Sequence, residues 1–389
     1  MTLGRLALAL AAWGALHGTA AAQAPRVYAR PATGYGAHAW RESGFGAMRG
    51  ATLGPIENTQ HPGVGYGTRA SAEALDELAR LGGNYVSITP FGRQWSLEST
   101  DIRMDFEAPF TENREAIKRV IAQAHARGLR VLLIPHLWVD MGGWRGEIGE
   151  KDSRGRERVF TPEEWTRWFA SYTRFVRQWA RVAEESHAEM FSIGVEMKSS
   201  SGTRGEWFDV IDAVRREYHG LLTYSANWEE ERTVMFWDRL DVVGIQAFYP
   251  LAERPGASLD ELRRAGVRRA EAIEAWAHAQ DRSVMFTEFG YTARTDPTLR
   301  PWEWPDGMSD VRVDEHAQAE AYRALLEAFV GRRWFAGAFV WRYYANPMDA
   351  SQEAAWGFSP RLREGEDVLR QIYDARFAWG ADSDARWEW

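Results

Sequence analysis

The sequence predicts a (β/α)8 barrel, and three observations support this prediction. Eight apolar segments of strand length occur along the chain, and amphipathic segments of helical length separate them. The segment over residues 131–134 is wholly apolar, as expected of a parallel strand that is covered on both faces. No linker or shift in composition interrupts the series. Alternating strands and helices favour parallel strands, and eight of them favour closure into a single (β/α)8 TIM barrel.

The expected strands are short apolar runs that end in polar or aromatic residues. They cover residues 45–53, 85–89, 131–134, 190–196, 221–228, 242–249, 283–291 and 335–344. The main alternative is a doubly wound open sheet, which would carry a glycine-rich phosphate turn after its first strand. The glycine-rich stretch at residues 63–67 lacks that strand–helix context, and we interpret it as a loop.

The expected helices follow the strands, with apolar residues spaced three and four apart. Two of them begin with capping patterns, Thr161 with Pro162 and Glu164, and Ser258 with Glu261. The first of these two helices carries large side chains on a single stripe, at the spacing of core residues, so we interpret them as packing rather than as ligand contacts. They are Trp165, Trp168, Phe169, Tyr172, Val176 and Trp179. Further helices are expected from residue 71, through 117–124, and over 207–218, 258–280, 322–329 and about 365–375.

Composition narrows the classes of function. A chain of 389 residues is long enough for one large domain. Its formal net charge of −8 argues against a nucleic-acid partner, because phosphate binding needs a basic face. The sequence has 20 Trp, which indicates either a large aromatic core or a surface that stacks sugars. It has no Cys, which excludes disulfides, thiolate nucleophiles and Cys-ligated metals.

The N-terminus is typical of a secretory signal peptide. Arg5 provides the positive charge, residues 6–16 the short apolar core, and an alanine-rich stretch ending at Ala24 the cleavage region. We therefore expect residues 1–24 to be removed and residues 25–389 to form one catalytic domain. The product would be a secreted or periplasmic protein with no membrane attachment, and we expect a monomer. The alternative is a disordered apolar N-terminus.

Candidate site residues follow from the fold, because the active site of such a barrel lies at the carboxyl ends of its strands. Two glutamates stand out there, since Glu196 and Glu288 each follow an apolar run. A carboxylate is costly inside a buried strand, but the exit of a strand can present it to a cavity. The other polar and aromatic residues that we place at strand ends are Arg49, Gln94, His136, Trp138, Lys198, Asn227, Trp228, Gln246, Tyr249, Tyr291, Trp341 and Arg342.

Two carboxylates, several aromatic rings and neutral hydrogen-bonding groups suit a polyhydroxylated neutral substrate. In glycoside hydrolysis one carboxylate attacks or activates water while the other protonates the leaving oxygen. A separation of about 5–5.5 Å between the carboxyl groups favours retention of configuration, and about 6.5–9.5 Å favours inversion. The alternative for each glutamate is a structural ion pair with an arginine.

The motifs around these glutamates resemble those of the clan A retaining glycoside hydrolases. The most similar group is family 113, whose characterised members are β-mannanases. The resemblance extends from about residue 45 to residue 360. It rests on IGVEMKSS around Glu196 and FTEFGY around Glu288, and on ALDELARLGGNYVSITP, GIQAFYP, GAFVWRYY and WGFSP elsewhere. It implies that Glu196 is the acid/base and Glu288 the nucleophile.

The resemblance also implies roles for several other residues. Tyr249 would hydrogen-bond the nucleophile, and Trp341 would form the sugar platform next to the cleavage point. His136, Asn227 and Trp228 would contact the substrate. Arg49, Trp138 and Lys198 join this group as substrate contacts because of their expected positions at strand ends. The chain departs from most of the clan at Val195, where an Asn usually precedes the acid/base and holds the sugar 2-hydroxyl.

Three other functions remain open at this stage. A metal-dependent hydrolase is disfavoured, because only His136 is a clear strand-end histidine and zinc usually needs three or four ligands. We therefore expect no metal and no cofactor. The second is an inactive barrel that binds polysaccharide in the same aromatic cleft. The third is hydrolysis of another β-glycan or an exopolysaccharide.

Overall fold

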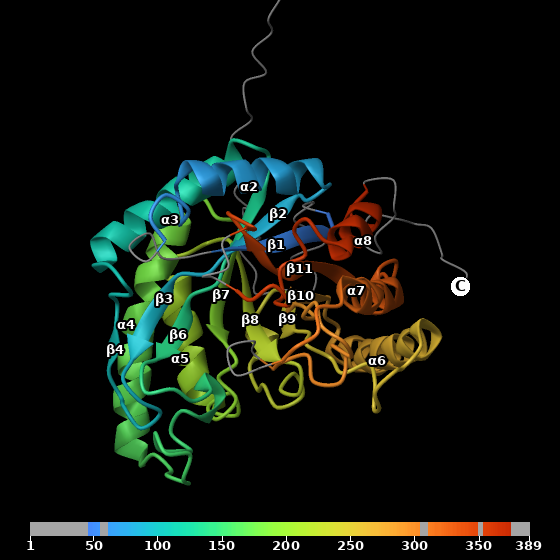
Figure 1. The fold of residues 1–389 in the computed structure, drawn as a ribbon. Helices are drawn as coiled ribbons and strands as arrows, with labels where there is room; N and C mark the ends of the chain where they lie inside the picture. The colour runs from blue at the N-terminus through green and yellow to red at the C-terminus, as the bar shows by residue number, and fades with distance from the viewer. Residues whose placement is uncertain (1–45, 55–60, 304–309, 349–352, 375–389) are drawn as a thin grey trace, which may run out of the picture.

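The computed structural model describes residues 46–54, 61–303, 310–348 and 353–374. The expected signal peptide lies outside these residues. Eight parallel strands form a closed barrel in the order β1-β11-β10-β9-β8-β7-β5-β2, so the predicted fold class is confirmed (Figure 1). The strands are β1 (Met48–Gly54), β2 (Tyr85–Ile88), β5 (Arg130–Leu133), β7 (Met190–Val195), β8 (Leu221–Asn227), β9 (Val243–Gln246), β10 (Val284–Phe289) and β11 (Phe335–Tyr344).

Helices surround the barrel, with α2 and α3 above it in Figure 1, α4 to its left, and α6, α7 and α8 to its right. Their bounds are α2 (Arg69–Arg80), α3 (Phe110–His125), α4 (Pro162–Glu185), α5 (Arg204–Arg215), α6 (Leu259–Gln280), α7 (Glu315–Phe329) and α8 (Glu364–Ile372). Both predicted capping boxes are present, at Thr161 with Glu164 and at Ser258 with Glu261. No helix among the described residues combines the length and apolar character needed to cross a membrane.

The alternation of strands and helices fails at one place. Between β8 and β9 the fully described chain forms only a 3-10 turn, η2 (Trp237–Arg239). Aromatic side chains cover the barrel there in place of a helix, because Phe236 and Trp237 are buried and pack against Tyr224. No particular helix was expected over these residues, and the general alternation of strands and helices does not hold for this connection.

The core has two layers, as expected for a barrel that is packed inside and covered outside. Eleven buried side chains, including Met48, Leu132, Met285 and Phe339, form one cluster that draws on seven of the strands and on Val242, just before β9, and fills the barrel. A larger cluster lies between the strands and the helices. The aromatic stripe of α4 belongs to this outer layer, since Trp168, Tyr172 and Trp179 are fully buried, so its interpretation as packing is confirmed.

A second, three-stranded sheet extends the barrel and was not expected from the sequence. It consists of β4 (Ile102–Arg103), β3 (Phe91–Gln94) and β6 (His136–Val139), in that order. Strands β3 and β6 follow β2 and β5 directly, so this sheet continues two neighbouring barrel strands beyond their carboxyl ends. We call it the wing sheet. One face packs on α4, where Trp168 Nε1 donates a hydrogen bond to Gln94 Oε1 at 2.9 Å.

Candidate active site

Both predicted glutamates lie at the carboxyl ends of barrel strands. Glu196 directly follows β7, and Glu288 is the fifth residue of β10, paired with Gln246 of β9. Glu288 is buried, with 3% of its surface exposed, whereas Glu196 is half-buried. The two carboxylates are close enough for the charge of Glu196 to act on Glu288. The structure thus brings together two groups that lie far apart in the sequence.

Glu196 is held in an unusual backbone conformation by its surroundings. Its φ of 52° lies in the left-handed region, which costs a non-glycine residue about 1 kcal/mol or more. Its side chain accepts hydrogen bonds from Asn227 Nδ2 at 2.9 Å and from Trp144 Nε1 at 3.3 Å. A strained residue with both carboxylate oxygens hydrogen-bonded is typical of a functional site rather than of a structural ion pair.

A third carboxylate, Glu230, supports the segments around Glu196. Glu230 is fully buried and accepts hydrogen bonds from Tyr224 Oη at 2.6 Å and from the backbone N of Asn227 at 2.9 Å. Tyr224 Oη in turn accepts a hydrogen bond from the backbone N of Met197, the residue after Glu196. Burial raises the pKa of Glu230 to about 7, and these hydrogen bonds oppose the shift. Glu230 therefore ties together the two segments that orient Glu196.

His136, at the start of β6, lies beside Glu288. Its Nε2 is 3.4 Å from Glu288 Oε1, and its Nδ1 is 2.8 Å from Arg145 Nη1. A guanidinium can only donate, so Nδ1 must accept and the proton of the neutral imidazole lies on Nε2, facing Glu288. Burial, with Arg145 and Arg342 nearby, lowers the pKa of His136 well below its usual value. His136 is thus neutral, with its Nε2–H on the side of Glu288, although the two atoms do not meet the geometry of a hydrogen bond at 3.4 Å.

The charge state of Glu288 depends on opposing influences. Burial raises its pKa well above the usual value, and the charge of Glu196 adds to this shift, while Arg145 and Arg342 lower it. Burial and the neighbouring charge of Glu196 therefore both disfavour the charged form of Glu288. The arginines decide how easily Glu288 carries the negative charge.

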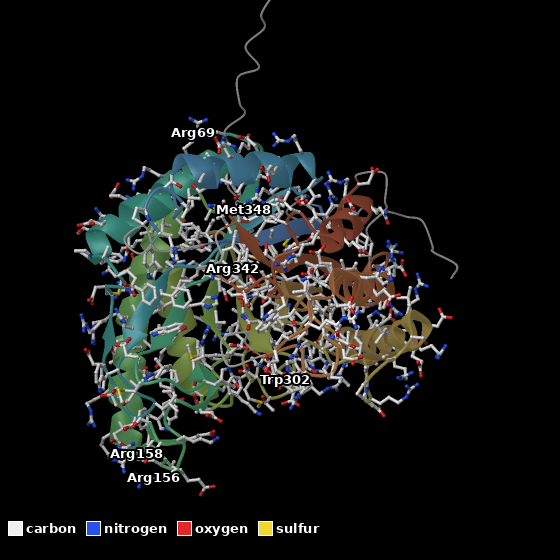
Figure 2. The ribbon with its side chains drawn as sticks, viewed as in Figure 1. Arg69, Arg156, Arg158, Trp302, Arg342 and Met348 are labelled. Carbon is white, nitrogen blue, oxygen red and sulfur yellow. The ribbon has the colours of Figure 1, made fainter. Side chains whose placement is uncertain are left out.

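Trp341, another predicted site residue, lies in β11 next to His136. Its indole is nearly parallel to the His136 ring, with 6.3 Å between centroids and 15° between planes. The Arg342 guanidinium lies 4.8 Å from the Trp341 ring centroid. Figure 2 labels Arg342 near the centre of the molecule. Trp341 is 7% exposed, so only a small part of its surface is accessible in this structure.

On the Glu196 side, the structure places Asn227, Trp228 and Lys198. Lys198 is exposed and its Nζ lies 5.9 Å from the ring centroid of Trp144, which bonds Glu196. Trp228 stacks on Trp302, with 5.3 Å between centroids and 20° between planes. Trp302, from the loop after β10, is 46% exposed and is labelled lower in Figure 2. The other tryptophan of that loop, Trp304, lies outside the described residues.

The prediction that Tyr249 hydrogen-bonds the nucleophile was wrong. The Tyr249 ring is fully buried against Phe286 and Phe329, with the Arg269 guanidinium 4.7 Å from its centroid. Among the described residues its hydroxyl has no hydrogen-bond partner. Tyr249 lies three residues beyond the end of β9, and its ring belongs to the cluster between the strands and the helices.

The prediction for Arg49 was also wrong. Arg49 is the second residue of the seven-residue strand β1, so it lies at the amino end of the barrel. Its Nε donates to the carbonyl of Gly82, and its backbone N donates to Asn84 Oδ1, both just before β2. The strand continues to Gly54, which places Arg49 at the opposite end from Glu196 and Glu288.

Arg145 and Glu230 were not predicted as site residues. Arg145 is in the short turn η1 (Arg145–Glu147), within a polar loop whose sequence shows no periodicity that would direct a side chain inward. Glu230 is one of three consecutive glutamates, residues 229–231, which read as a solvated run. Only the tertiary contacts with His136 and Asn227 reveal them. No group of His, Asp or Glu among the described residues is arranged to hold a metal ion.

A closed (β/α)8 barrel with two interacting glutamates at the ends of its fourth and seventh barrel strands is the architecture of a glycoside hydrolase. Comparison with known families agrees with this class. The model of Glycoside Hydrolase Family 113 matches residues 59–357, and the chain belongs to this family. No curated protein sequence matches the chain.

Solved structures of the same family superimpose on most of the chain. The GH113 β-mannanase of Alicyclobacillus acidocaldarius, in complex with ManMIm, is 28% identical with a TM-score of 0.70, over 85% of this chain and 98% of the other. A GH113 β-1,4-mannanase solved as a complex is 25% identical with a TM-score of 0.70, over 85% and 100%. An endoglucanase from Pseudomonas stutzeri, 15% identical with a TM-score of 0.53 over 87% and 95%, shares the fold.

Proposed function

We propose that the protein is a retaining endo-β-mannanase that cleaves β-1,4-linked mannan through a covalent intermediate. The observation that carries the proposal is the contrast between the two carboxylates. Glu288 is buried beside a neutral N–H donor and two arginines, while Glu196 is half-buried and held by two neutral donors. Such a difference in environment divides the roles of nucleophile and acid/base. Family membership and the mannanases of similar structure support the choice of substrate.

In the first step the Glu288 carboxylate bonds to the anomeric carbon as the glycosidic C–O bond breaks, and Glu196 gives its proton to the leaving oxygen. In the second step Glu196 takes a proton from water, which attacks the anomeric carbon and releases the Glu288 carboxylate. The reactive form therefore has its proton on Glu196 and its charge on Glu288. Arg145, Arg342 and the His136 N–H favour this form electrostatically.

The aromatic residues around the pair would bind the sugar chain. Trp341 is proposed as the platform for the sugar that undergoes reaction, with His136 beside it. Asn227, Lys198 and the stacked pair Trp228 and Trp302 lie on the side of Glu196, where the leaving sugar departs. Stacked rings with an exposed face suit the apolar face of a pyranose.

We further propose that residues 1–24 direct export and that residues 25–389 act as a monomer outside the cytoplasm. A polymer substrate is accessible there. N-terminal sequencing of the mature protein, with light scattering on the same sample, tests this proposal. A retained Met1 would contradict it.

The substrate assignment is tested by incubating the mature protein with mannan, glucomannan, cellulose and xylan, together with Glu196→Ala and Glu288→Ala. We expect manno-oligosaccharides from mannan and glucomannan, with both variants inactive on them. Hydrolysis of cellulose or xylan alone would overturn the choice of mannan and leave the two-glutamate mechanism standing. Hydrolysis that persists in both variants would overturn the mechanism itself.

Removing Arg145 is expected to lower kcat by about 10- to 100-fold, because the hydrogen bond from Arg145 to His136 Nδ1 fixes the tautomer of the His136 ring. Arg145→Met leaves His136 Nδ1 without its donor and removes a cation that lowers the pKa of Glu288. The acid limb of the kcat/KM profile should therefore move to higher pH, and Arg145→Lys should restore part of this shift. Arg154→Met, in the same loop but exposed, is the control. An unchanged pH profile would contradict the role of Arg145.

Glu288→Gln is expected to stabilise the folded protein at neutral pH by about 1 kcal/mol or more, because a buried ionisable group at an active site opposes folding. The folded pKa of Glu288 is raised, so its unfavourable contribution is absent below the pKa of an unfolded glutamate, about 4.3, and grows as pH rises. Urea unfolding at several pH values measures this difference. Glu189→Gln, which alters a buried acceptor of the Val131 N–H, should instead destabilise. Equal stability of wild type and Glu288→Gln at neutral pH would contradict the expectation.

A further inference from the structure

The wing sheet presents an aromatic face on the side away from α4. Half of the surface of Trp138 is exposed there. Its two neighbours in β6, Leu137 and Val139, point to the opposite face of the sheet and are buried. On the neighbouring strand the face against α4 is closed, because a Cβ on Gly92 would lie 2.5 Å from Phe175. A large indole exposed on one face of a sheet that is otherwise packed is a candidate ligand contact.

The Trp138 ring is held in place by other aromatic rings. The ring centroid of Phe91 lies 6.4 Å, and that of Phe106 6.3 Å, from the centroid of the Trp138 ring, and both contacts are edge-on. The rings of Phe91 and Phe106 stack on each other with 5.0 Å between their centroids. Phe91 also lies 5.0 Å from the ring of His136. Ring contacts therefore run without a break from Trp341 through His136 and Phe91 to Trp138. A flat side chain fixed in this way loses little conformational freedom when it binds a ligand.

Polar groups border the same face. Arg93 pairs with Trp138 across the two strands, and its Nε donates to Asp140 Oδ1 at 2.8 Å. Glu107 lies on the other side of Arg93, at 3.8 Å. A stacking ring with hydrogen-bonding groups at its edge matches the two surfaces of a pyranose, its apolar face and its ring of hydroxyls.

The position of the wing sheet indicates which part of the substrate it meets. Strand β6 begins at His136, beside Glu288, and Trp138 projects from the same face two residues on, about 6.6 Å farther along. Glu288, as nucleophile, stays with the non-reducing part of the chain, whereas the leaving part departs past Glu196, Asn227 and Trp228. The wing sheet is therefore next to the non-reducing part.

We propose that the wing sheet is a binding subsite for the non-reducing portion of a β-linked hexose chain, with Trp138 stacking on a sugar one or two units beyond the sugar at Trp341. This inference rests on the proposed function, because it extends the same cleft outward. The wing sheet, which lies outside the barrel, would then determine how the enzyme distinguishes substrates by the number of sugars on the non-reducing side.

The test uses 4-nitrophenyl β-glycosides of mannobiose, mannotriose and mannotetraose, which share one leaving group and differ only in the non-reducing part. Wild type, Trp138→Ala, Trp138→Phe and Trp95→Ala are compared through kcat/KM. Trp95 is the matched control, an indole 64% exposed at the end of β3 that makes no ring contact with the cluster among the described residues. Thermal unfolding confirms that each variant is folded.

In the wild type, kcat/KM should rise as sugars are added. In Trp138→Ala, the increase in kcat/KM caused by one of the added sugars should be about tenfold smaller than in the wild type. Trp138→Phe should keep most of that increase, and Trp95→Ala should keep all of it. A rise that is unchanged in Trp138→Ala, or equally reduced in Trp95→Ala, overturns the subsite while the proposed function stands. A wild type that hydrolyses neither these glycosides nor mannan overturns the proposed function, and the subsite with it.

Discussion

Glu288→Gln is expected to reduce kcat on mannan by about 10⁵-fold or more, the size of effect seen when the nucleophile of a covalent mechanism is lost. The substitution keeps the shape of the side chain and its place beside His136, so binding of mannan should change little. Activity is measured by reducing-end release and binding by titration calorimetry.

The environment of Glu288 explains why no neighbour can replace it. The proton of the neutral His136 ring is on Nε2, the nitrogen beside Glu288, so this atom has no free lone pair with which to attack the anomeric carbon. Glu189→Gln is the matched control, because Glu189 is also a buried glutamate but lies before β7, at the amino end of the barrel. A Glu288→Gln enzyme with activity within tenfold of the wild type would exclude a nucleophilic role.

Glu196→Ala is expected to reduce kcat on mannan by about 10²- to 10⁴-fold, the usual contribution of a general acid and base. The loss should be smaller in the first step on a 2,4-dinitrophenyl β-mannoside, because this leaving group departs without a proton. Azide should then accelerate the second step, since it attacks the anomeric carbon without needing a base. The product would be a β-mannosyl azide.

The control for Glu196 is Asn227→Ala, which removes the 2.9 Å hydrogen bond to its carboxylate but leaves the carboxylate in place. That variant should be impaired on mannan without any azide rescue. If Glu196→Ala lost the same factor on mannan and on the dinitrophenyl glycoside, and azide had no effect, Glu196 would not be the acid/base.

Much of the fold follows from local patterns in the sequence. The apolar run at residues 131–134 and the capping boxes at Thr161 and Ser258 are local features, and each appears where it was expected. The wing sheet was missed because β3 and β6 follow β2 and β5 after only a short interruption, so each pair resembles one strand. The aromatic packing between β8 and β9 could not be predicted, because it depends on distant residues such as Trp276.

The site was predicted only in part, for reasons of strand geometry. Glu196, Glu288, His136 and Trp341 were found because they follow apolar runs of clear length. Tyr249 failed because it lies beyond the end of β9, where the alternation of side chains no longer fixes its direction, and Arg49 failed because it lies near the start of β1 and not at its carboxyl end. The position of Arg145 depends on the path of a loop, which no periodic pattern records.

If Glu196 acts as acid/base and Glu288 as nucleophile, hydrolysis retains the anomeric configuration. The most direct test is proton NMR of the anomeric configuration of the first product formed from a β-manno-oligosaccharide, before mutarotation. A retaining enzyme releases the new reducing end first as the β-anomer, which then converts slowly to α. Initial appearance of the α-anomer would show inversion and would contradict a covalent intermediate on Glu288.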